Sequence, residues 1–340
     1  MPSFRNDYCY LAHPRILEAL SKHQDECQGA YGLDVHSAKA AEYQKHTFGS
    51  KEGEVFFLAG GTQTNMAFIS YCLRPYEGVI SCDSGHINVH ETAAVEGSGH
   101  KVIVVPNKDG KLTSQDVYDV AAYYQDEHMV KPGMVYISNS TEIGSIYHKK
   151  ELEDLYKACK ECGYVFFIDG ARLGSALTCE ENDVKPSEMG SLCDAFYVGG
   201  TKNGFLYGEA LVINNKSLQK DFRYHIKNKG AMLAKGFVVG MQFEEMFRDG
   251  LYFELAKTTN EAAASLRKVF AKYGLKMAPS PTNQIFVTLP KDKANALLKE
   301  FSLEKWNEVG EEMTVRFVTS FKTTKEDIQE VDDFLAKLLK

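Results

Sequence analysis

Several features that would point to common partners are missing from this sequence. No apolar run approaches the roughly 20 residues of a membrane span, and no block of Lys and Arg forms a basic face for nucleic acid or an anionic surface. The formal charge is -7 over 340 residues. The beginning of the chain also lacks the basic, apolar and small-residue order of a secretory leader. We therefore expect neither a nucleic-acid nor a membrane partner, and a cytoplasmic location.

Cysteines follow no regular framework. The eight of them are scattered through the chain, which favours small apolar side chains in a reducing compartment. Cys159 and Cys162 form the single CxxC pattern, at the end of a predicted helix and without a second Cys or His pair at metal spacing. We interpret them as ordinary helix cysteines and predict no metal site.

Two nucleotide-binding patterns are also absent, GxGxxG and the Walker pattern. What is present is an alternation of short apolar runs with helical patterns between about residues 54 and 213. Because the runs are continuously apolar, both faces of each strand should be buried, which predicts a mostly parallel sheet of about seven strands covered by helices. The runs span residues 54–59, 78–82, 101–105, 134–138, 164–169, 195–199 and 210–213.

The pattern changes after about residue 245. A long helical stretch at 253–274 is followed by apolar runs at 283–290 and 314–321 and by a closing helix at 324–340. This predicts a large α/β domain over residues 31–245 and a smaller α+β domain over residues 246–340. Residues 1–30 should pack beside the smaller domain or against a neighbouring subunit.

Polar residues follow four of the predicted strands. In an open α/β sheet ligands gather at the carboxyl ends of strands, so these positions are the place to look for chemistry. Each has a plain structural alternative, such as a turn, a helix cap or a solvated loop charge. The four segments are Gly60-Gly-Thr-Gln-Thr, Asp83-Ser-Gly-His86, Asp169-Gly-Ala-Arg172 and Gly199-Gly-Thr-Lys202.

Together the four segments indicate one cofactor. Pyridoxal phosphate needs a lysine for its covalent link, a carboxylate to keep the pyridine nitrogen protonated, a helix N-terminus for the phosphate and a flat group over the ring. Lys202, Asp169, the Gly61-Thr62 segment and His86 supply these in turn. The glycines around Lys202 should let the backbone approach the cofactor, and burial should lower the lysine pKa.

The chain resembles the threonine aldolases, within the aspartate-aminotransferase fold class. The segments FLAGGTQTN, DSGHINVHETAAVEG, FFIDGARLGSA, GGTKNGFLYGEALVI and MTVRFVTS occur in that family's order and at roughly its spacing. The resemblance implies a pyridoxal-phosphate-dependent cleavage of β-hydroxy amino acids such as L-threonine and L-allo-threonine to glycine and an aldehyde. It also implies a homodimer or homotetramer.

The same resemblance implies roles for individual residues. Lys202 would hold the cofactor and Asp169 would pair with its pyridine nitrogen, while His86 would stack on the ring. Phosphate would be held by Gly61, Thr62 and Thr201. The substrate carboxylate would be bound by Arg172 and Arg316, with Asn6 and Tyr31 near the substrate, and His86 and His128 are the candidate bases.

Departures from the family pattern concern the substrate. Asn6 stands where the family has Ser, and Leu233 stands where a glycine-rich segment of the family has Arg. Two alternatives remain open at this stage. The first is another reaction of the same cofactor, such as β-elimination, racemisation or transamination, and the second is a non-catalytic protein of the same fold. Retention of Arg172 and Arg316 disfavours the second, because a carrier has no substrate to orient.

Overall fold

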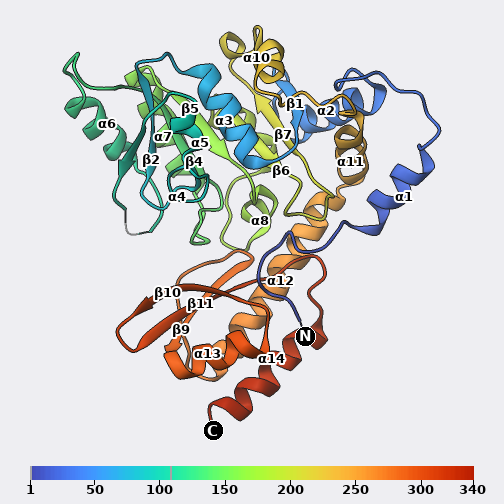
Figure 1. The fold of residues 1–340 in the computed structure, drawn as a ribbon, viewed down its shortest axis with the longest axis vertical. Helices are drawn as coiled ribbons and strands as arrows, with labels where there is room; N and C mark the ends of the chain where they lie inside the picture. Colours follow the sequence, from blue (N-terminus) through green and yellow to red (C-terminus); the bar gives the residue numbers. More distant parts are fainter. Residues whose placement is uncertain (1, 108) are drawn as a thin grey trace.

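In the computed structural model, which describes residues 2–107 and 109–340, seven strands form one mixed sheet (Figure 1). Its strand order is β1-β7-β6-β5-β4-β2-β3. Strand β7 is antiparallel to both of its neighbours, and the other pairings are parallel. The predicted mostly parallel sheet is confirmed. The strands are β1 (Glu54–Leu58), β2 (Glu77–Cys82), β3 (Val102–Val105), β4 (Lys131–Ser138), β5 (Val165–Asp169), β6 (Ala195–Gly199) and β7 (Glu209–Ile213).

Both faces of this sheet are buried, as the continuous apolar runs predicted. Along β4, Val135 and Ile137 belong to one apolar cluster, whereas Met134 and Tyr136 belong to a second cluster on the opposite face. All four side chains are almost fully buried. The alternation of side chains along a strand therefore feeds two separate cores from one run of sequence.

Helices cover the two faces. Residues of α2, α6, α7 and α11 join the first core, and residues of α3, α5 and α10 join the second. Asp34 starts α2 by accepting a hydrogen bond from the backbone N–H of Ser37 at 2.8 Å. The helices are α1 (Pro14–Lys22), α2 (Val35–Thr47), α3 (Gly61–Cys72), α4 (His86–Val89), α5 (Ala94–Gly97), α6 (Ser114–Tyr123), α7 (Lys149–Cys162), α8 (Leu173–Thr178), α9 (Met189–Leu192), α10 (Phe222–Asn228) and α11 (Phe237–Phe247).

The C-terminal part is a four-stranded antiparallel sheet with three helices. Its strand order is β10-β11-β9-β8, and its core includes Phe4 from the beginning of the chain, which contacts Phe301 and Phe317. The first residues of the chain thus pack on the smaller part, whereas α1 packs against α11 of the larger part. The expectation for residues 1–30 as a whole stays a prediction. The elements are α12 (Leu251–Lys272), β8 (Lys276–Met277), β9 (Gln284–Pro290), α13 (Lys291–Glu300), β10 (Glu304–Val309), β11 (Glu312–Val318) and α14 (Lys325–Leu338).

Helix α12 joins the two parts. It packs against α8 of the larger part and against α14 of the smaller one, and Figure 1 shows it running from one to the other. The division at residue 245 stays a prediction. Within residues 2–107 and 109–340, no helix is both long and apolar enough to span a bilayer.

Candidate active site

A cavity of about 310 Å³ lies at the carboxyl ends of the central strands. Its volume is at the lower end of the roughly 300–1,000 Å³ that is typical of small-molecule sites. Seven of the predicted residues line it, each from a strand end or the segment that follows. They are Gly61, Thr62, His86, Asp169, Arg172, Thr201 and Lys202.

Asp169, at the end of β5, is buried and strongly hydrogen bonded. Its Oδ2 accepts from the Tyr136 hydroxyl at 2.7 Å and from the Asn65 amide at 2.9 Å, and its Oδ1 accepts from the backbone N–H of Ala171 at 2.9 Å. Burial raises the pKa of this carboxyl, but the charge of His86 and these hydrogen bonds outweigh burial, so the pKa lies below its ordinary value. Asp169 is therefore an ionised acceptor inside the cavity.

Lys202 lies in the turn between β6 and β7. Burial, and next the charge of Arg172, lower the pKa of its amine, against the opposite effect of Asp7. A lowered pKa increases the share of the neutral amine, which is the nucleophilic form. Its Nζ also lies 5.9 Å from the centre of the Tyr8 ring, so the N-terminal segment borders the lysine.

The glycines beside Lys202 are required for close packing of backbone against backbone. A Cβ on Gly199 would come within 2.3 Å of the Ala171 carbonyl oxygen, and a Cβ on Gly200 within 2.6 Å of the Gly208 carbonyl oxygen. Backbone packs against backbone at both positions, so the glycines allow the end of β6 to approach the turn after β5 and the start of β7. The expectation that the glycines also let the backbone approach the cofactor stays a prediction.

The first turn of α3 borders the same cavity. Gly60 precedes the helix without a side-chain cap, and a Cβ on this residue would meet open space. The first backbone N–H groups of a helix have no partner inside the helix, and the helix dipole is positive at this end. Gly61 and Thr62 therefore present a suitable environment for an anionic group such as phosphate.

His86 begins the short helix α4 and is held from two sides. Its Nδ1 lies 2.7 Å from Oε1 of Glu91, whose side chain is fully buried. The backbone N–H of His86 donates to Oε1 of Glu142 at 2.9 Å. With Nδ1–H donated to Glu91, the Nε2 atom of a neutral ring remains an acceptor.

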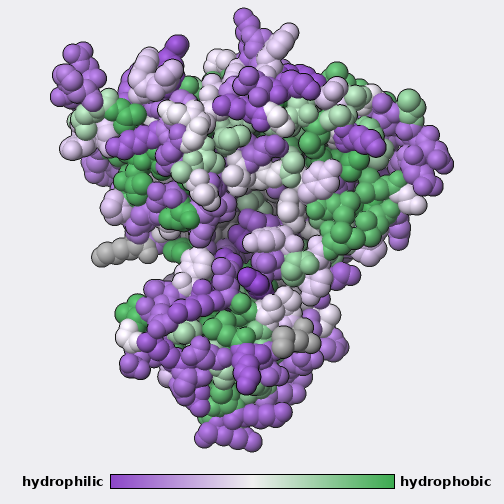
Figure 2. All heavy atoms as spheres, viewed as in Figure 1, coloured by the Kyte–Doolittle hydropathy of each residue, from purple (hydrophilic) through white to green (hydrophobic). Residues whose placement is uncertain are grey.

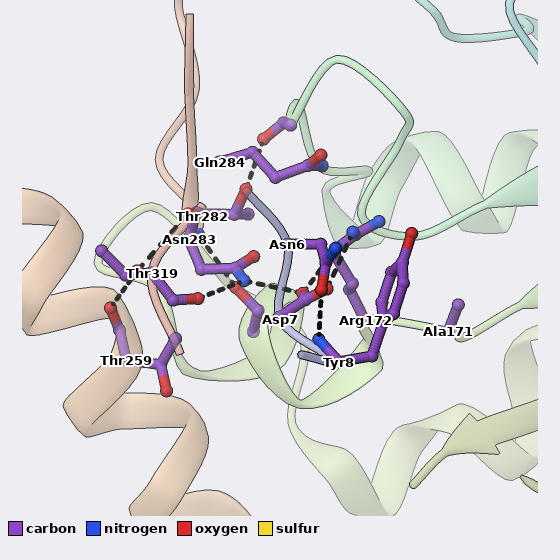
Figure 3. A network of polar contacts seen from close by, with 12 residues as sticks. Asn6, Asp7, Tyr8, Ala171, Arg172, Thr259, Thr282, Asn283, Gln284 and Thr319 are labelled. Carbon is purple, nitrogen blue, oxygen red and sulfur yellow. Dashed lines mark hydrogen bonds and ion pairs between the residues drawn. The ribbon is translucent and has the colours of Figure 1, made fainter. Parts of the chain in front are cut away.

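Arg172 is bound to a residue that the sequence did not single out. Its Nε and Nη2 donate to the two carboxylate oxygens of Asp7 at 2.7 and 3.0 Å (Figure 3). The amide of Asn283 also donates to Asp7, at 2.9 Å. Asp7 thus occupies the Nε–Nη2 edge of the guanidinium and leaves its Nη1–Nη2 edge for another acceptor.

Arg316 lies on β11 outside the set of residues lining the cavity. Val315 and Phe317 point into the core, while the Arg316 side chain lies on the other face of the strand and is only 11% exposed. Its guanidinium donates to Glu304 and, at 3.3 Å, to Gln284, and lies 5.1 Å from the centre of the Trp306 ring. The charge of Arg172 lowers the pKa of Arg316 in addition to the larger effect of burial, which means that the two arginines are near each other.

Besides Arg316, three predicted residues lie outside the set that lines this cavity. His128 is 86% exposed and pairs with Asp126 at 2.8 Å, in the segment between α6 and β4. Tyr31 is 40% exposed and lies under the Lys227 ammonium. Asn6 lies beside Asp7 in the N-terminal segment, where its side chain accepts from the backbone of Tyr8 (Figure 3).

Sequence reasoning missed two buried carboxyl groups in the cavity, Glu142 and Glu209. Burial raises the pKa of both, and that of Glu209 to about 8. Glu209 accepts from the Thr201 hydroxyl and from the Gly200 backbone, each at 2.9 Å. An acidic residue opening an otherwise apolar strand run was the available signal for Glu209.

Comparison with known proteins places the chain in a family. The profile of the β-eliminating lyases matches residues 15–292. The chain belongs to that family. This β-eliminating lyase family member is 32% identical to a low specificity L-threonine aldolase of a Pseudomonas species, over 84% of the chain and 83% of the relative.

Solved structures agree with this family assignment. A threonine aldolase of Leishmania major is 40% identical, with a TM-score of 0.98 over 100% of both chains. An aspartate aminotransferase of Thermus thermophilus has a TM-score of 0.73 over 99% of this chain and 91% of its own, at 13% identity. The second likeness shows the shared fold alone, and it confirms the predicted aminotransferase-like architecture.

Proposed function

We propose that the protein is a pyridoxal-phosphate-dependent carbon–carbon lyase that cleaves L-threonine, L-allo-threonine and related β-hydroxy amino acids to glycine and an aldehyde. The observation that carries this proposal is that Lys202, Asp169 and Arg172 share one cavity in a chain 40% identical throughout to a threonine aldolase. Within the β-eliminating lyase family, this relationship favours cleavage of the Cα–Cβ bond over elimination.

The cavity fits the cofactor by the chemistry of its walls. Lys202 would hold the aldehyde carbon, and the ionised Asp169 would keep the pyridine nitrogen protonated. The uncapped start of α3 at Gly61 and Thr62 would hold the phosphate together with Thr201. His86 would lie over the ring. When bound, pyridoxal phosphate supplies an electron sink that accepts the electron pair released at Cα.

The residues of the chain then position the substrate. The Nη1–Nη2 edge of Arg172 would donate two hydrogen bonds to the substrate α-carboxylate, with Arg316 adding a second positive charge. Asp7 fixes the orientation of Arg172 by occupying its other edge. Holding the carboxylate in this way selects which bond at Cα is aligned for cleavage.

The β-hydroxyl proton needs an acceptor. We assign this role to Nε2 of His86, because Glu91 holds the opposite nitrogen of the ring and the ring lines the cavity. The location of His128 on the surface of its own chain removes it from the role of base within that chain's cavity. A histidine at this position would also return a proton after the aldehyde departs.

Exposed apolar residues support a homo-oligomer. Figure 2 shows hydrophobic side chains gathered on the face that carries α1 and α11. Exposed large apolar residues concentrate between residues 8 and 35, namely Tyr8, Tyr10, Leu11, Leu17, Tyr31, Leu33 and Val35. Such a concentration is typical of a surface that another subunit covers. The eight cysteines are all unpaired, which supports a cytoplasmic location.

A direct test is the visible spectrum of the purified protein before and after addition of L-threonine, L-allo-threonine, serine or glycine, with aldehyde assayed in parallel. We expect visible absorbance from the lysine-bound cofactor, a change on adding each amino acid, and aldehyde from the β-hydroxy amino acids. A 2-oxo acid and ammonia without glycine would favour the β-elimination alternative, and no absorbance would contradict a cofactor on Lys202.

A further inference from the structure

Three potential metal ligands meet outside the cavity, near the end of α1. His23 and Glu26 follow that helix directly, and His36 lies in the first turn of α2. One ligand atom from each residue lies within 4.8 Å of the others. None of the three lines the cavity described above. No metal site was predicted from the sequence, because a His-x-x-Glu turn with a distant histidine does not form the paired Cys and His pattern of common metal sites.

Both histidines point at one carboxylate. His23 Nδ1 lies 2.6 Å from Oε1 of Glu26, and His36 Nε2 lies 3.0 Å from Oε2 of the same group. The two imidazole rings are 4.7 Å apart, centre to centre. Two nitrogen donors and a carboxylate that converge on one point are the common arrangement of a divalent metal site.

A second carboxylate, that of Glu244, contacts the other ring nitrogen of His36. Its Nδ1 lies 2.5 Å from Oε2 of Glu244 on α11, and Lys39 pairs with the other oxygen of that glutamate at 3.4 Å. The His36 side chain is only 5% exposed, so its orientation is fixed. A carboxylate on the far nitrogen of a histidine is what orients metal-bound imidazoles in many proteins.

The proton count at His36 makes this arrangement informative. A neutral imidazole carries one N–H and so can donate to only one of two carboxylates. With Nδ1–H donated to Glu244, the lone pair of Nε2 faces the Glu26 carboxylate, and two acceptors then oppose each other. Either a second proton or a cation must lie between them. The groups around His36 that determine this balance are Glu26, His23, Glu244 and Lys39.

We propose that His23, Glu26 and His36 bind a first-row divalent transition-metal ion, with Zn²⁺ as the ion of choice. The ligand atoms are Nδ1 of His23, a carboxylate oxygen of Glu26 and Nε2 of His36, and water takes the fourth position because Glu26 is 43% exposed. Glu244 orients His36 through Nδ1. Two imidazoles in the set favour Zn²⁺ over Ca²⁺ and Mg²⁺, which prefer oxygen ligands alone.

The position of the cluster suggests a structural role for the ion. It would join the turn after α1 to α2 and, through Glu244, to α11, the three elements that Figure 1 shows side by side. The other end of α1 contacts the loop of the lysine, since the backbone N–H of His13 donates to the Gly204 carbonyl at 2.7 Å. Binding to the folded state alone should raise the unfolding temperature.

The test uses the cofactor-loaded, tag-free full chain, first treated with a chelator and then titrated with ZnCl₂ in a calorimeter. We expect one site per chain. His23→Ala, at a partly exposed position, and Glu26→Gln, at an exposed one, should remove that site. Glu244→Gln should weaken zinc binding about 10- to 100-fold. Circular dichroism checks that each variant is folded.

Matched controls separate this site from adventitious zinc binding. His46→Ala changes an exposed histidine of α2 outside the cluster, and Cys27→Ser removes the exposed thiol next to Glu26. Both should bind zinc as the wild-type protein does, and zinc should raise the unfolding temperature of both but not of His23→Ala. Absence of zinc binding by the wild-type chain, binding unchanged in His23→Ala and Glu26→Gln, or binding lost in Cys27→Ser would overturn the proposal.

Discussion

The carboxylate of Asp7 and the guanidinium of Arg172 form a buried two-bond ion pair, although 165 residues separate them in the sequence. The Asp7 side chain is 1% exposed and that of Arg172 is 12% exposed. The pair therefore attaches the N-terminal segment to the wall of the cavity, and it fixes the orientation of the Arg172 guanidinium.

Asp7→Asn should destabilise the protein by about 3–5 kcal/mol, because it leaves the Arg172 charge buried without its partner. Burial raises the pKa of Asp7, but the charges of Arg172 and Lys202 and the hydrogen bonds from Arg172 and Asn283 together outweigh burial and hold the pKa below its ordinary value of 3.8. The contribution of Asp7 is therefore present at neutral pH and lost as the pH falls through that lowered pKa.

Urea unfolding of the cofactor-loaded protein, monitored by circular dichroism, measures this effect. The double variant Asp7→Asn with Arg172→Gln is the matched control, and it should recover part of the lost stability because the unpaired charge is gone. A loss below about 1 kcal/mol in Asp7→Asn, the range of exposed ion pairs, would contradict a buried structural pair.

Arg316→Lys should raise the KM for L-threonine strongly and leave the visible absorbance of the lysine-bound cofactor intact. Lysine cannot reproduce a two-bond fork to a carboxylate, and the loss of one charge-assisted contact of about 1.5–3 kcal/mol corresponds to a roughly 10- to 150-fold weaker productive interaction. Steady-state kinetics and an absorption spectrum measure the two quantities. Loss of absorbance would assign Arg316 to the cofactor or the fold, and an unchanged KM would exclude it from substrate binding.

Glu304→Gln is the companion variant for Arg316. The Glu304 carboxylate accepts a hydrogen bond from the Arg316 guanidinium, so it would compete with the substrate carboxylate for that group. Removing its charge should lower the KM by up to about fivefold, the range expected from a partly exposed ion pair.

Trp306 is the one tryptophan of the chain and lies against Arg316, so its fluorescence should change when glycine binds.

Glu209 should make stability depend on pH. Its pKa of about 8 in the folded protein exceeds its ordinary value of 4.5. The contribution of protonated Glu209 to stability is thus fully present below pH 4.5. It is lost between pH 4.5 and about 8, as the pH rises through the raised pKa. Relative to Glu209→Gln, the wild-type protein should lose up to about 1.4 kcal/mol of unfolding free energy for each pH unit in this window.

Unfolding of the cofactor-free protein at a series of pH values measures this difference. Glu312→Gln, at an exposed position of β11, is the control and should follow the wild-type profile. A difference between wild type and Glu209→Gln that stays constant with pH would show that Glu209 does not titrate in this window.

The oligomeric state can be checked by light scattering. We predict at least a dimer at micromolar concentration, since the exposed apolar residues between Tyr8 and Val35 require a cover. Leu11→Glu and Leu33→Glu, at 69% and 71% exposed positions, should shift the protein towards monomers, whereas a glutamate at the distant Val309 should not. A fully active wild-type monomer would contradict the prediction.

The sequence was most informative at the strand ends of the larger part. Lys202, Asp169 and His86 each follow a continuous apolar run, and parallel strands bring their carboxyl ends to one edge of the sheet. Local patterns therefore sufficed to bring distant residues together. The sheet and the cores on its two faces were predictable for a related reason. Strands that are apolar along their whole length must be covered on both faces, and a parallel sheet between two layers of helices provides this.

Two kinds of contact were not predictable from local patterns. They are the contacts of the N-terminal segment with distant residues and the contacts of the exposed strand β10. Strand β10 has a mostly exposed sequence, so its pairing with β11, which brings Glu304 to Arg316, left no apolar pattern. Asp7 reaches Arg172 only because the N-terminal segment folds back along the smaller part. His128 was taken from a family motif, and no local pattern distinguishes a surface histidine from one at the cavity.

The products formed from L-threonine test the central proposal most directly. Wild-type protein should yield glycine and acetaldehyde in equal amounts, measured by amino-acid analysis and an aldehyde assay on the same sample. Lys202→Ala should yield neither and should lack the visible absorbance of bound cofactor. Formation of a 2-oxo acid and ammonia without glycine, or normal turnover by Lys202→Ala, would contradict a lyase that cleaves the Cα–Cβ bond with Lys202 at its centre.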